Sequence, residues 1–197
     1  IVCTAGRLFA EEGTHTTLER IAEVAGVGVG TIYRRFASID ELVAVVLEEK
    51  MASYADRAEE FAAQSSTQPW EAFEGYVRFI LEQQTSDLAF SQVILDPSGA
   101  SRAFQSEIRR AFTATLTIVE TAKAAGSVRA DLDHSDLLLL IHANAGIVGS
   151  LGQAAREASA RVGQYMLEAF RDVTAPPLPP PPRAWARASG PGSAGEG

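Results

Sequence analysis

"AGVGVGTIYRRF" occupies residues 25–36, and its alternating glycines followed by a tyrosine and two arginines decide how the chain is interpreted. A dinucleotide-binding loop of the form G-x-G-x-x-G follows a β-strand. Here the glycines follow TLERIAEVA, which has the apolar spacing of a helix, and the third glycine comes one position early. The stretch therefore favours the turn of a helix-turn-helix over a phosphate-binding loop.

The helix-turn-helix interpretation gives the residues of the turn definite roles. Gly26 can adopt the left-handed conformation that redirects the chain, and Val27 is an apolar plug between the two helices. Ile32 and Phe36, four residues apart, share one face of the second helix and anchor it to the protein. In this arrangement the second helix can lie in the major groove of DNA.

The outward side of that second helix carries groups that bind nucleic acid. Hydroxyls reach phosphates or base edges, arginines bind phosphate or guanine, and glycines let backbone N–H groups approach phosphate closely. The predicted contact residues are Gly28, Val29, Gly30, Thr31, Tyr33, Arg34 and Arg35. The alternative is that the arginines form a solvated face and that the tyrosine belongs to the core.

Helical periodicity continues on both sides of this motif. Apolar residues recur at three- and four-residue spacing, and no segment alternates like a strand for long. Two capping boxes, Thr16 with Glu19 and Ser38 with Glu41, open the helices before and after the motif. We therefore expect an all-α protein with a DNA-binding domain over residues 1–47, a second helical domain over 48–173 and a Pro/Gly-rich tail over 174–197.

The composition limits the partners that the chain can have. Its 197 residues carry a net charge of −8, which disfavours binding of phosphates over the whole surface. Because salt screens charges over about 10 Å, a local basic face can still bind DNA beside an acidic body. No run reaches the roughly 20 apolar residues of a membrane span, and no signal-peptide pattern opens the sequence. We expect a cytoplasmic, nucleoid-associated protein without a membrane partner.

The last two expected helices predict a homodimer. Asp133 and Asp136 cap a helix that is apolar on all sides, which must be buried all round. The final helix, over about residues 159–173, carries one apolar stripe, and together the two resemble half of a four-helix seam. The predicted interface residues are Leu140, Ile147, Leu151, Val162, Met166 and Phe170. The alternative is a purely intramolecular core.

The second domain has more aromatic side chains than its amphipathic helices need. Ligand pockets are mostly apolar with a few fixed polar groups, so we expect a cavity for an apolar or aromatic effector. The predicted lining is drawn from Phe73, Val77, Phe90, Phe112, Leu116 and His142. The alternative is that these residues are ordinary core, with the histidine satisfied in the core or at the interface.

Catalysis has little support in the sequence. The histidines at 15, 134 and 142 do not have the spacing of metal ligands, and neither an H-E-x-x-H motif nor a nucleophile elbow occurs. We therefore expect no enzyme activity, no metal and no cofactor, although His15 lies near the DNA-binding helices and could contact phosphate. The tail, TAPPLPPPPRAWARASGPGSAGEG, favours polyproline II and disorder, either as a passive end or as a proline-rich ligand.

Two stretches resemble the N-terminal domain of the TetR family of transcriptional repressors. These are AGRLFAEEGTHTT and TTLERIAEVAGVGVGTIYRRFASIDELVAVV, and together they cover about residues 1–47. Beyond residue 50 the similarity is loose. The segment AAGSVRADLDHSDLLLLI is similar to one that precedes the first dimerisation helix in many members of the family.

The resemblance implies a homodimer of about nine helices, a palindromic operator in double-stranded DNA and an effector pocket in the C-terminal domain. It also places Thr17 at a phosphate-contacting position. The family usually has lysine where this chain has Ile39, so one phosphate contact is lost. The expected function is a ligand-responsive, DNA-binding transcriptional repressor. The alternative is a helical dimer that binds a small molecule or a protein and has lost DNA binding.

Overall fold

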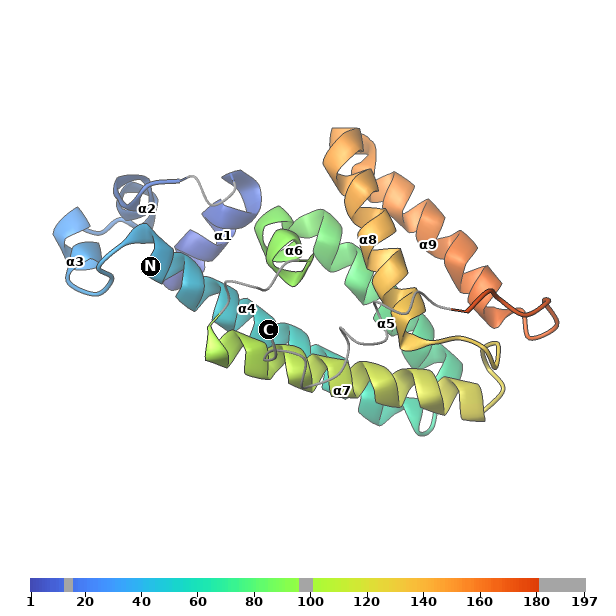
Figure 1. The fold of residues 1–197 in the computed structure, drawn as a ribbon. Coiled ribbons are helices and arrows are strands. Elements are labelled where there is room, and N and C mark those ends of the chain that lie inside the picture. The colour runs from blue at the N-terminus through green and yellow to red at the C-terminus, as the bar shows by residue number, and fades with distance from the viewer. Residues whose placement is uncertain (13–15, 96–100, 181–197) are drawn as a thin grey trace, which may run out of the picture.

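The computed structural model describes residues 1–12, 16–95 and 101–180, and these residues form helices and connecting segments without a strand. Figure 1 shows a small head of short helices at one end of a larger helical body. The elements are α1 (Val2–Glu12), α2 (Leu18–Ala25), α3 (Val29–Tyr33), α4 (Ile39–Ser65), α5 (Pro69–Ser86), α6 (Leu88–Leu95), α7 (Arg102–Ala124), α8 (His134–Leu151), the 3₁₀ helix η1 (Gly152–Ala154) and α9 (Ala155–Arg171). The all-α prediction is confirmed.

The head packs α1, α2 and α3 onto the first turns of α4. Its small core includes Phe9, Ile21, Ile32 and Leu42, each at most 1% exposed. These four residues come from four different helices and pack together at the centre of the head. Each large apolar side chain that leaves water contributes about 1.5–3 kcal/mol, which is how helices this short remain folded.

Helix α4 joins the head to the body. Val46 is the last residue of α4 in the head core, and Leu47 is the first in the body core. This change of core lies beside the predicted domain boundary at residues 47 and 48, which stays a prediction. A rigid helix shared by both cores can transmit movement of the body to the head.

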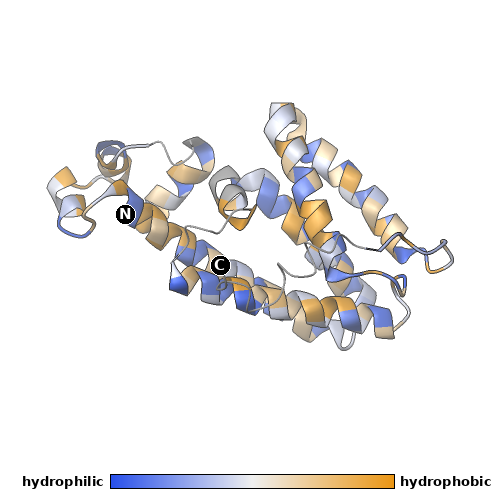
Figure 2. Ribbon diagram, in the orientation of Figure 1, coloured by the Kyte–Doolittle hydropathy of each residue, from blue (hydrophilic) through white to orange (hydrophobic). Residues whose placement is uncertain are grey.

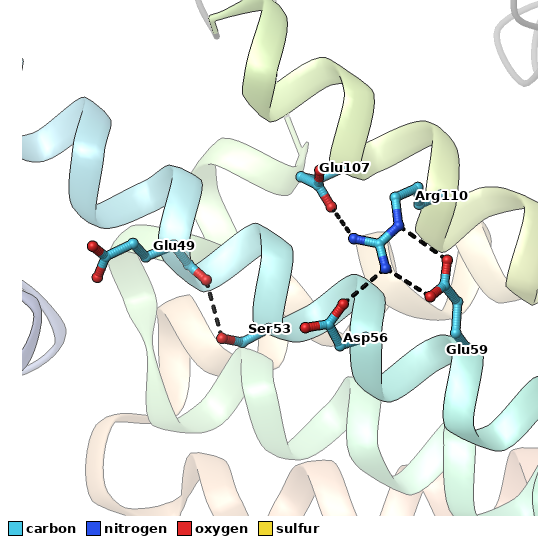
Figure 3. A network of polar contacts seen from close by, with 6 residues as sticks. All are labelled: Glu49, Ser53, Asp56, Glu59, Glu107 and Arg110. Atoms are coloured by element: carbon cyan, nitrogen blue, oxygen red, sulfur yellow. Dashed lines mark hydrogen bonds and ion pairs between the residues drawn. The ribbon is translucent and has the colours of Figure 1, made fainter.

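The body surrounds α5, which packs against α4, α7, α8 and α9. On the outside, α4 and α7 run side by side over much of their length (Figure 1). The Arg110 guanidinium on α7 bridges them by donating to Asp56 at 2.8 Å and to both carboxylate oxygens of Glu59 on α4 (Figure 3). Hydrogen bonds that the guanidinium donates to Glu59 and Asp56 raise the pKa of Arg110 further above its ordinary value. The bridge links the exposed sides of the two helices, whose buried sides share the body core.

Three helix boundaries differ from those predicted. Thr17 rather than Thr16 caps α2, because its Oγ1 accepts the backbone N–H of Arg20 at 3.2 Å. Helix α3 ends at Tyr33, and the chain continues to Phe36 as a turn. Helix α9 begins at Ala155, four residues before the predicted start, since alanine-rich sequence extends a helix without an apolar stripe.

The first part of the tail is held against the body. The buried Arg129 guanidinium donates to the carbonyl oxygen of Pro176 at 2.7 Å, and the backbone N–H of Leu178 donates to Asp131 at 2.7 Å. Arg129 also pairs with Asp131, and its hydrogen bonds hold the pKa of that carboxyl well below the usual range. Residues 174–178 are therefore anchored, whereas the predictions for 181–197 lie outside the described residues.

Candidate nucleic-acid interface and effector cavity

The turn before α3 has the geometry that its sequence predicts. Gly26 has φ +67° and ψ +30°, in the left-handed region. Its N–H donates to the carbonyl oxygen of Glu23 at 3.2 Å, and the N–H of Val27 donates to that of Ala22 at 3.0 Å. These bonds satisfy the last carbonyls of α2 and set the angle at which the chain leaves for α3.

Helix α3 presents one face to the protein and the other to solvent. Ile32 is fully buried and Phe36 is 4% exposed, so both anchor the helix as predicted. The predicted contact residues lie on the opposite side or at its edges, with Val29 40% and Tyr33 52% exposed. The structure therefore excludes Tyr33 from the core and brings the predicted set onto one outward surface at the tip of the head (Figure 1).

Two side-chain contacts hold this surface in place before any ligand arrives. The Tyr33 hydroxyl donates to Glu19 Oε1 at 3.1 Å, which ties α3 to α2. Hydrogen bonds from its own backbone N–H and from Tyr33 lower the pKa of Glu19 below its ordinary value. Arg34 donates to Thr31 Oγ1 at 3.1 Å, so its guanidinium is held along the outward face. Both contacts reduce the conformational freedom that binding would remove.

Two positions beside α3, Thr17 before α2 and Ile39 at the start of α4, differ in whether they face solvent. Thr17 is exposed, its oxygen accepts the backbone N–H of Arg20 as the helix cap, and its side chain also hydrogen-bonds to the Glu19 carboxylate. Ile39 is half-buried and packs on the head core instead of reaching outward as a lysine would. Ser38 caps α4 by accepting the N–H of Glu41 at 3.2 Å, as predicted. His15 lies outside the described residues.

Alanine at Gly26 and at Gly30 should have opposite effects on stability. Gly26→Ala places a side chain at positive φ and is expected to destabilise the protein by about 1–2 kcal/mol. In Gly30→Ala the new Cβ meets no atom within 4 Å, so we expect stability to rise by up to about 1 kcal/mol while DNA affinity falls. Urea unfolding and DNA titration of both variants test this. A Gly30→Ala protein with unchanged DNA affinity would remove Gly30 from the contact surface.

An apolar cavity of about 150 Å³ lies in the body between α4, α5, α6, α7 and α8. Its few polar side chains are Tyr54 on α4, Tyr76 on α5, Thr115 on α7 and His134 at the start of α8. The lining consists of Met51, Tyr54, Tyr76, Ile80, Ile94, Ile108, Ala111, Phe112, Thr115, His134, Leu137, Leu138 and Ile141. The cavity therefore has the mostly apolar wall and sparse polar groups of a small-molecule site.

Of the six residues predicted to line a pocket, Phe112 lines this cavity. The other predicted residues lie elsewhere: Phe73, Val77 and Phe90 are in the body core, Leu116 is half-buried, and His142 is exposed. The His142 ring contacts the Leu138 carbonyl oxygen one turn earlier in α8. For this cavity the prediction placed the wrong histidine, because His134 at the start of α8 is the one that lines it.

Helices α8 and α9 leave an apolar face without a partner in the protomer. Leu139 is 39%, Leu151 47% and Tyr165 54% exposed, whereas Ile147, Val162 and Met166 are partly buried. Two predicted interface residues, Leu140 and Phe170, are 2% and 3% exposed in the protomer's own core. They have little surface left for a partner, whereas Leu139 and Tyr165 are exposed on the same two helices.

The stretch of chain that forms α8 and α9 also qualifies, by length and composition alone, as a candidate membrane span. The stretch His134–Arg171 contains a sufficiently apolar window, of which 17% is buried, contrary to the expectation that no run would be apolar enough. At Gly152, with φ +52°, the chain turns, and α8 and α9 pack against each other as a hairpin (Figure 1). Hydrophobic segments are visible on both helices in Figure 2.

Among the described residues, no group of three or more histidine, cysteine, aspartate or glutamate side chains is placed to hold a metal ion. The clustered carboxylates on α4 and α7 instead surround Arg110 (Figure 3).

Comparison with known proteins identifies the family. Residues 1–46 match "Bacterial regulatory proteins, tetR family", and residues 68–169 match "Transcriptional regulator SbtR-like, C-terminal domain". No curated protein matches the sequence at a significant level.

Solved structures match along most of the chain. A TetR transcriptional regulator from Streptomyces coelicolor is 26% identical, with a TM-score of 0.63 over 86% of this chain and 95% of its own. A TetR regulatory protein from Mycobacterium vanbaalenii is 25% identical, with a TM-score of 0.62 over 86% and 92%. The transcriptional regulator FadR from Bacillus subtilis, solved in complex with stearoyl-CoA, is 19% identical, with a TM-score of 0.63 over 88% of this chain and 97% of its own. The chain is therefore a member of the TetR family of bacterial transcriptional regulators.

Proposed function

We propose that the protein is a ligand-responsive transcriptional repressor that binds a palindromic operator as a homodimer in the cytoplasm. The observation that carries the proposal is the outward surface of α3, which gathers Thr31, Tyr33, Arg34 and two glycines on a rigidly anchored helix. Phosphate contacts from Thr17 and from the backbone near Gly28 would orient it, and the side chains would contact base edges.

The apolar face of α8 and α9 supports the dimer. Leu139, Ile147, Leu151, Val162 and Tyr165 place apolar surface on the hairpin that is exposed in one protomer. Exposed apolar surface of this kind marks an interaction site, and packing against a second hairpin would make a four-helix interface. A two-fold axis through it would present two copies of α3 to an inverted repeat.

The cavity supports control by an effector. Met51 and Tyr54 of its wall lie on α4, the helix that also carries Leu42 and Val46 of the head core. A ligand that favours one position of α4 would change the separation of the two heads and hence the affinity for successive grooves. The structural relatives include FadR in complex with stearoyl-CoA, the ketosteroid regulator KstR2 and SmeT, the repressor of a multidrug efflux pump.

Selection from a random DNA library tests the DNA-binding function. The purified protein should enrich an inverted repeat whose half-site centres are one helical turn, about 10–10.5 base pairs, or a multiple of it apart. If no sequence is enriched even at low salt, the proposed repressor function is rejected.

That negative result would favour the alternative, a dimer that binds only a small molecule or protein. The net charge of −8 and the inward packing of Ile39 are the observations on its side. The two proposals share the cavity and the α8–α9 face, so only the DNA experiment separates them.

A further inference from the structure

The cavity contains one polar atom that the protein itself leaves without a partner. His134 Nε2 is buried and makes no hydrogen bond among the described residues, and no other polar side-chain atom of the lining is in that position. A buried polar nitrogen without a partner costs about 1–3 kcal/mol. Such an atom at the wall of an apolar cavity points to a bound molecule that supplies the missing hydrogen bond.

The other polar groups of the wall are engaged with one another. The Thr115 hydroxyl donates to the Ala111 carbonyl oxygen at 2.8 Å, so the Tyr76 hydroxyl is the donor in its 2.5 Å hydrogen bond to Thr115 Oγ1. Burial raises the pKa of Tyr76, and raises that of Tyr54 well above the ordinary value, so both hydroxyls stay neutral. His134 Nε2 is therefore the polar atom of the wall that still lacks a hydrogen-bond partner.

The surroundings of His134 decide what kind of group fits. Its Nδ1 lies 3.4 Å from Asp133 Oδ1, and a carboxylate there favours a proton on Nδ1. A neutral ring then offers the Nε2 lone pair to a hydrogen-bond donor. Burial acts to raise the pKa of Asp133, but hydrogen bonds from Ser135 lower it more, so the group stays ionised.

The same surroundings disfavour a negatively charged ligand. Asp131, Asp133 and Asp136 lie close together at this end of α8, and they outnumber the two cations that interact with them, Arg129 and Lys123. A ligand carboxylate would be repelled by these groups, whereas a neutral hydroxyl would not. A hydroxyl donor is thus the polar group that suits His134.

The size and the lining of the cavity indicate what the remainder of the ligand is. An apolar cavity of about 150 Å³ accommodates a molecule the size of benzene, and a ring that carries a hydroxyl and an ethyl group has roughly nine non-hydrogen atoms. Tyr54, Tyr76 and Phe112 supply aromatic walls, and the Phe112 ring meets the His134 ring edge-on at 5.3 Å. These aromatic walls suit a flat ring.

We infer that the effector is a small mono-aromatic alcohol of the phenol class, whose hydroxyl donates to His134 Nε2 while its ring fills the cavity. This inference rests on the proposed function that the domain binds an effector. It makes His134 the residue that separates phenols from hydrocarbons of the same shape.

Calorimetric titration of the full chain with 4-ethylphenol, 4-ethylanisole and ethylbenzene tests the inference. The three probes share an ethyl-substituted ring, but only 4-ethylphenol carries a hydrogen-bond donor. We expect the wild type to bind the phenol about tenfold more tightly than either of the other two. We expect His134→Phe to bind all three within about threefold of one another, and His134→Gln to recover part of the phenol preference.

A second readout does not require the variants to fold. The ¹⁵N resonance of His134 Nε2 in the wild type should move on addition of 4-ethylphenol and stay in place with ethylbenzene. Equal binding of the three probes, a phenol preference that survives in His134→Phe, or no binding of any probe by a protein that still enriches an operator would each overturn the inference. Phenol binding by a protein that enriches no operator would instead overturn the proposed repressor and leave the ligand class standing.

Discussion

The Gly146→Glu protein is expected to be a folded 21.0 kDa monomer that binds operator DNA at least about 100-fold more weakly than the wild type. Gly146 is exposed on α8, and a Cβ added there meets no atom of the protomer within 4 Å. The protomer therefore tolerates the side chain. Gly146 lies two helical turns after the exposed Leu139, on the same side of α8. In the proposed dimer the carboxylate would therefore be buried against the partner hairpin without a counter-charge, which costs several kcal/mol.

Sedimentation velocity and DNA titration measure the two effects, and circular dichroism verifies the fold. The matched control is Thr117→Glu, which adds the same charge at an exposed position of α7 outside the proposed interface. It should remain a dimer with unchanged operator affinity. A Gly146→Glu protein that is still dimeric would show that subunits meet elsewhere.

Arg34→Ala is expected to weaken binding by about 1–3 kcal/mol for each half-site, because a guanidinium that contacts a guanine is worth this much. The side chain is held along the outer face of α3 by Thr31, so its removal should leave the head folded. Titration of the selected operator and of a variant operator substituted at a single symmetric position distinguishes base contact from phosphate contact. Loss of affinity for both operators alike would indicate phosphate.

Arg57→Ala provides the control for this experiment. Arg57 is a half-exposed arginine of α4 that pairs with Glu60 and lies over the Phe61 ring, away from α3. Its removal changes the net charge as Arg34→Ala does and should leave operator affinity within about twofold at moderate salt. Equal losses in the two variants would mean that net charge, rather than α3, governs binding.

The DNA-binding head could be predicted from sequence because its geometry is set locally. A left-handed Gly26, a capped α4 and two inward residues at four-residue spacing each follow from neighbours in the chain. The choice between Thr16 and Thr17 as cap could not be predicted in this way. Both offer the same hydroxyl at the start of the same helix, so the sequence pattern fits either one.

The cavity and the interface depended on contacts between distant segments. In the leucine run at 137–140 every position is apolar, so periodicity cannot tell that Leu140 packs inward and Leu139 outward. His134 sits beside the helix cap, where a polar residue is ordinary, and it becomes notable only because α7 brings Phe112 against it. Such facts emerge from the packing of helix faces rather than from the pattern along one helix.

Methylation protection of the selected operator by the full-length wild-type protein tests the central claim most directly. Dimethyl sulfate modifies guanine N7 in the major groove and adenine N3 in the minor groove. If α3 enters the major groove twice per dimer, guanine N7 should be protected in both half-sites, in two patches related by the symmetry of the inverted repeat. Guanines that stay fully reactive in a saturated complex, or protection confined to adenine N3, would contradict the account.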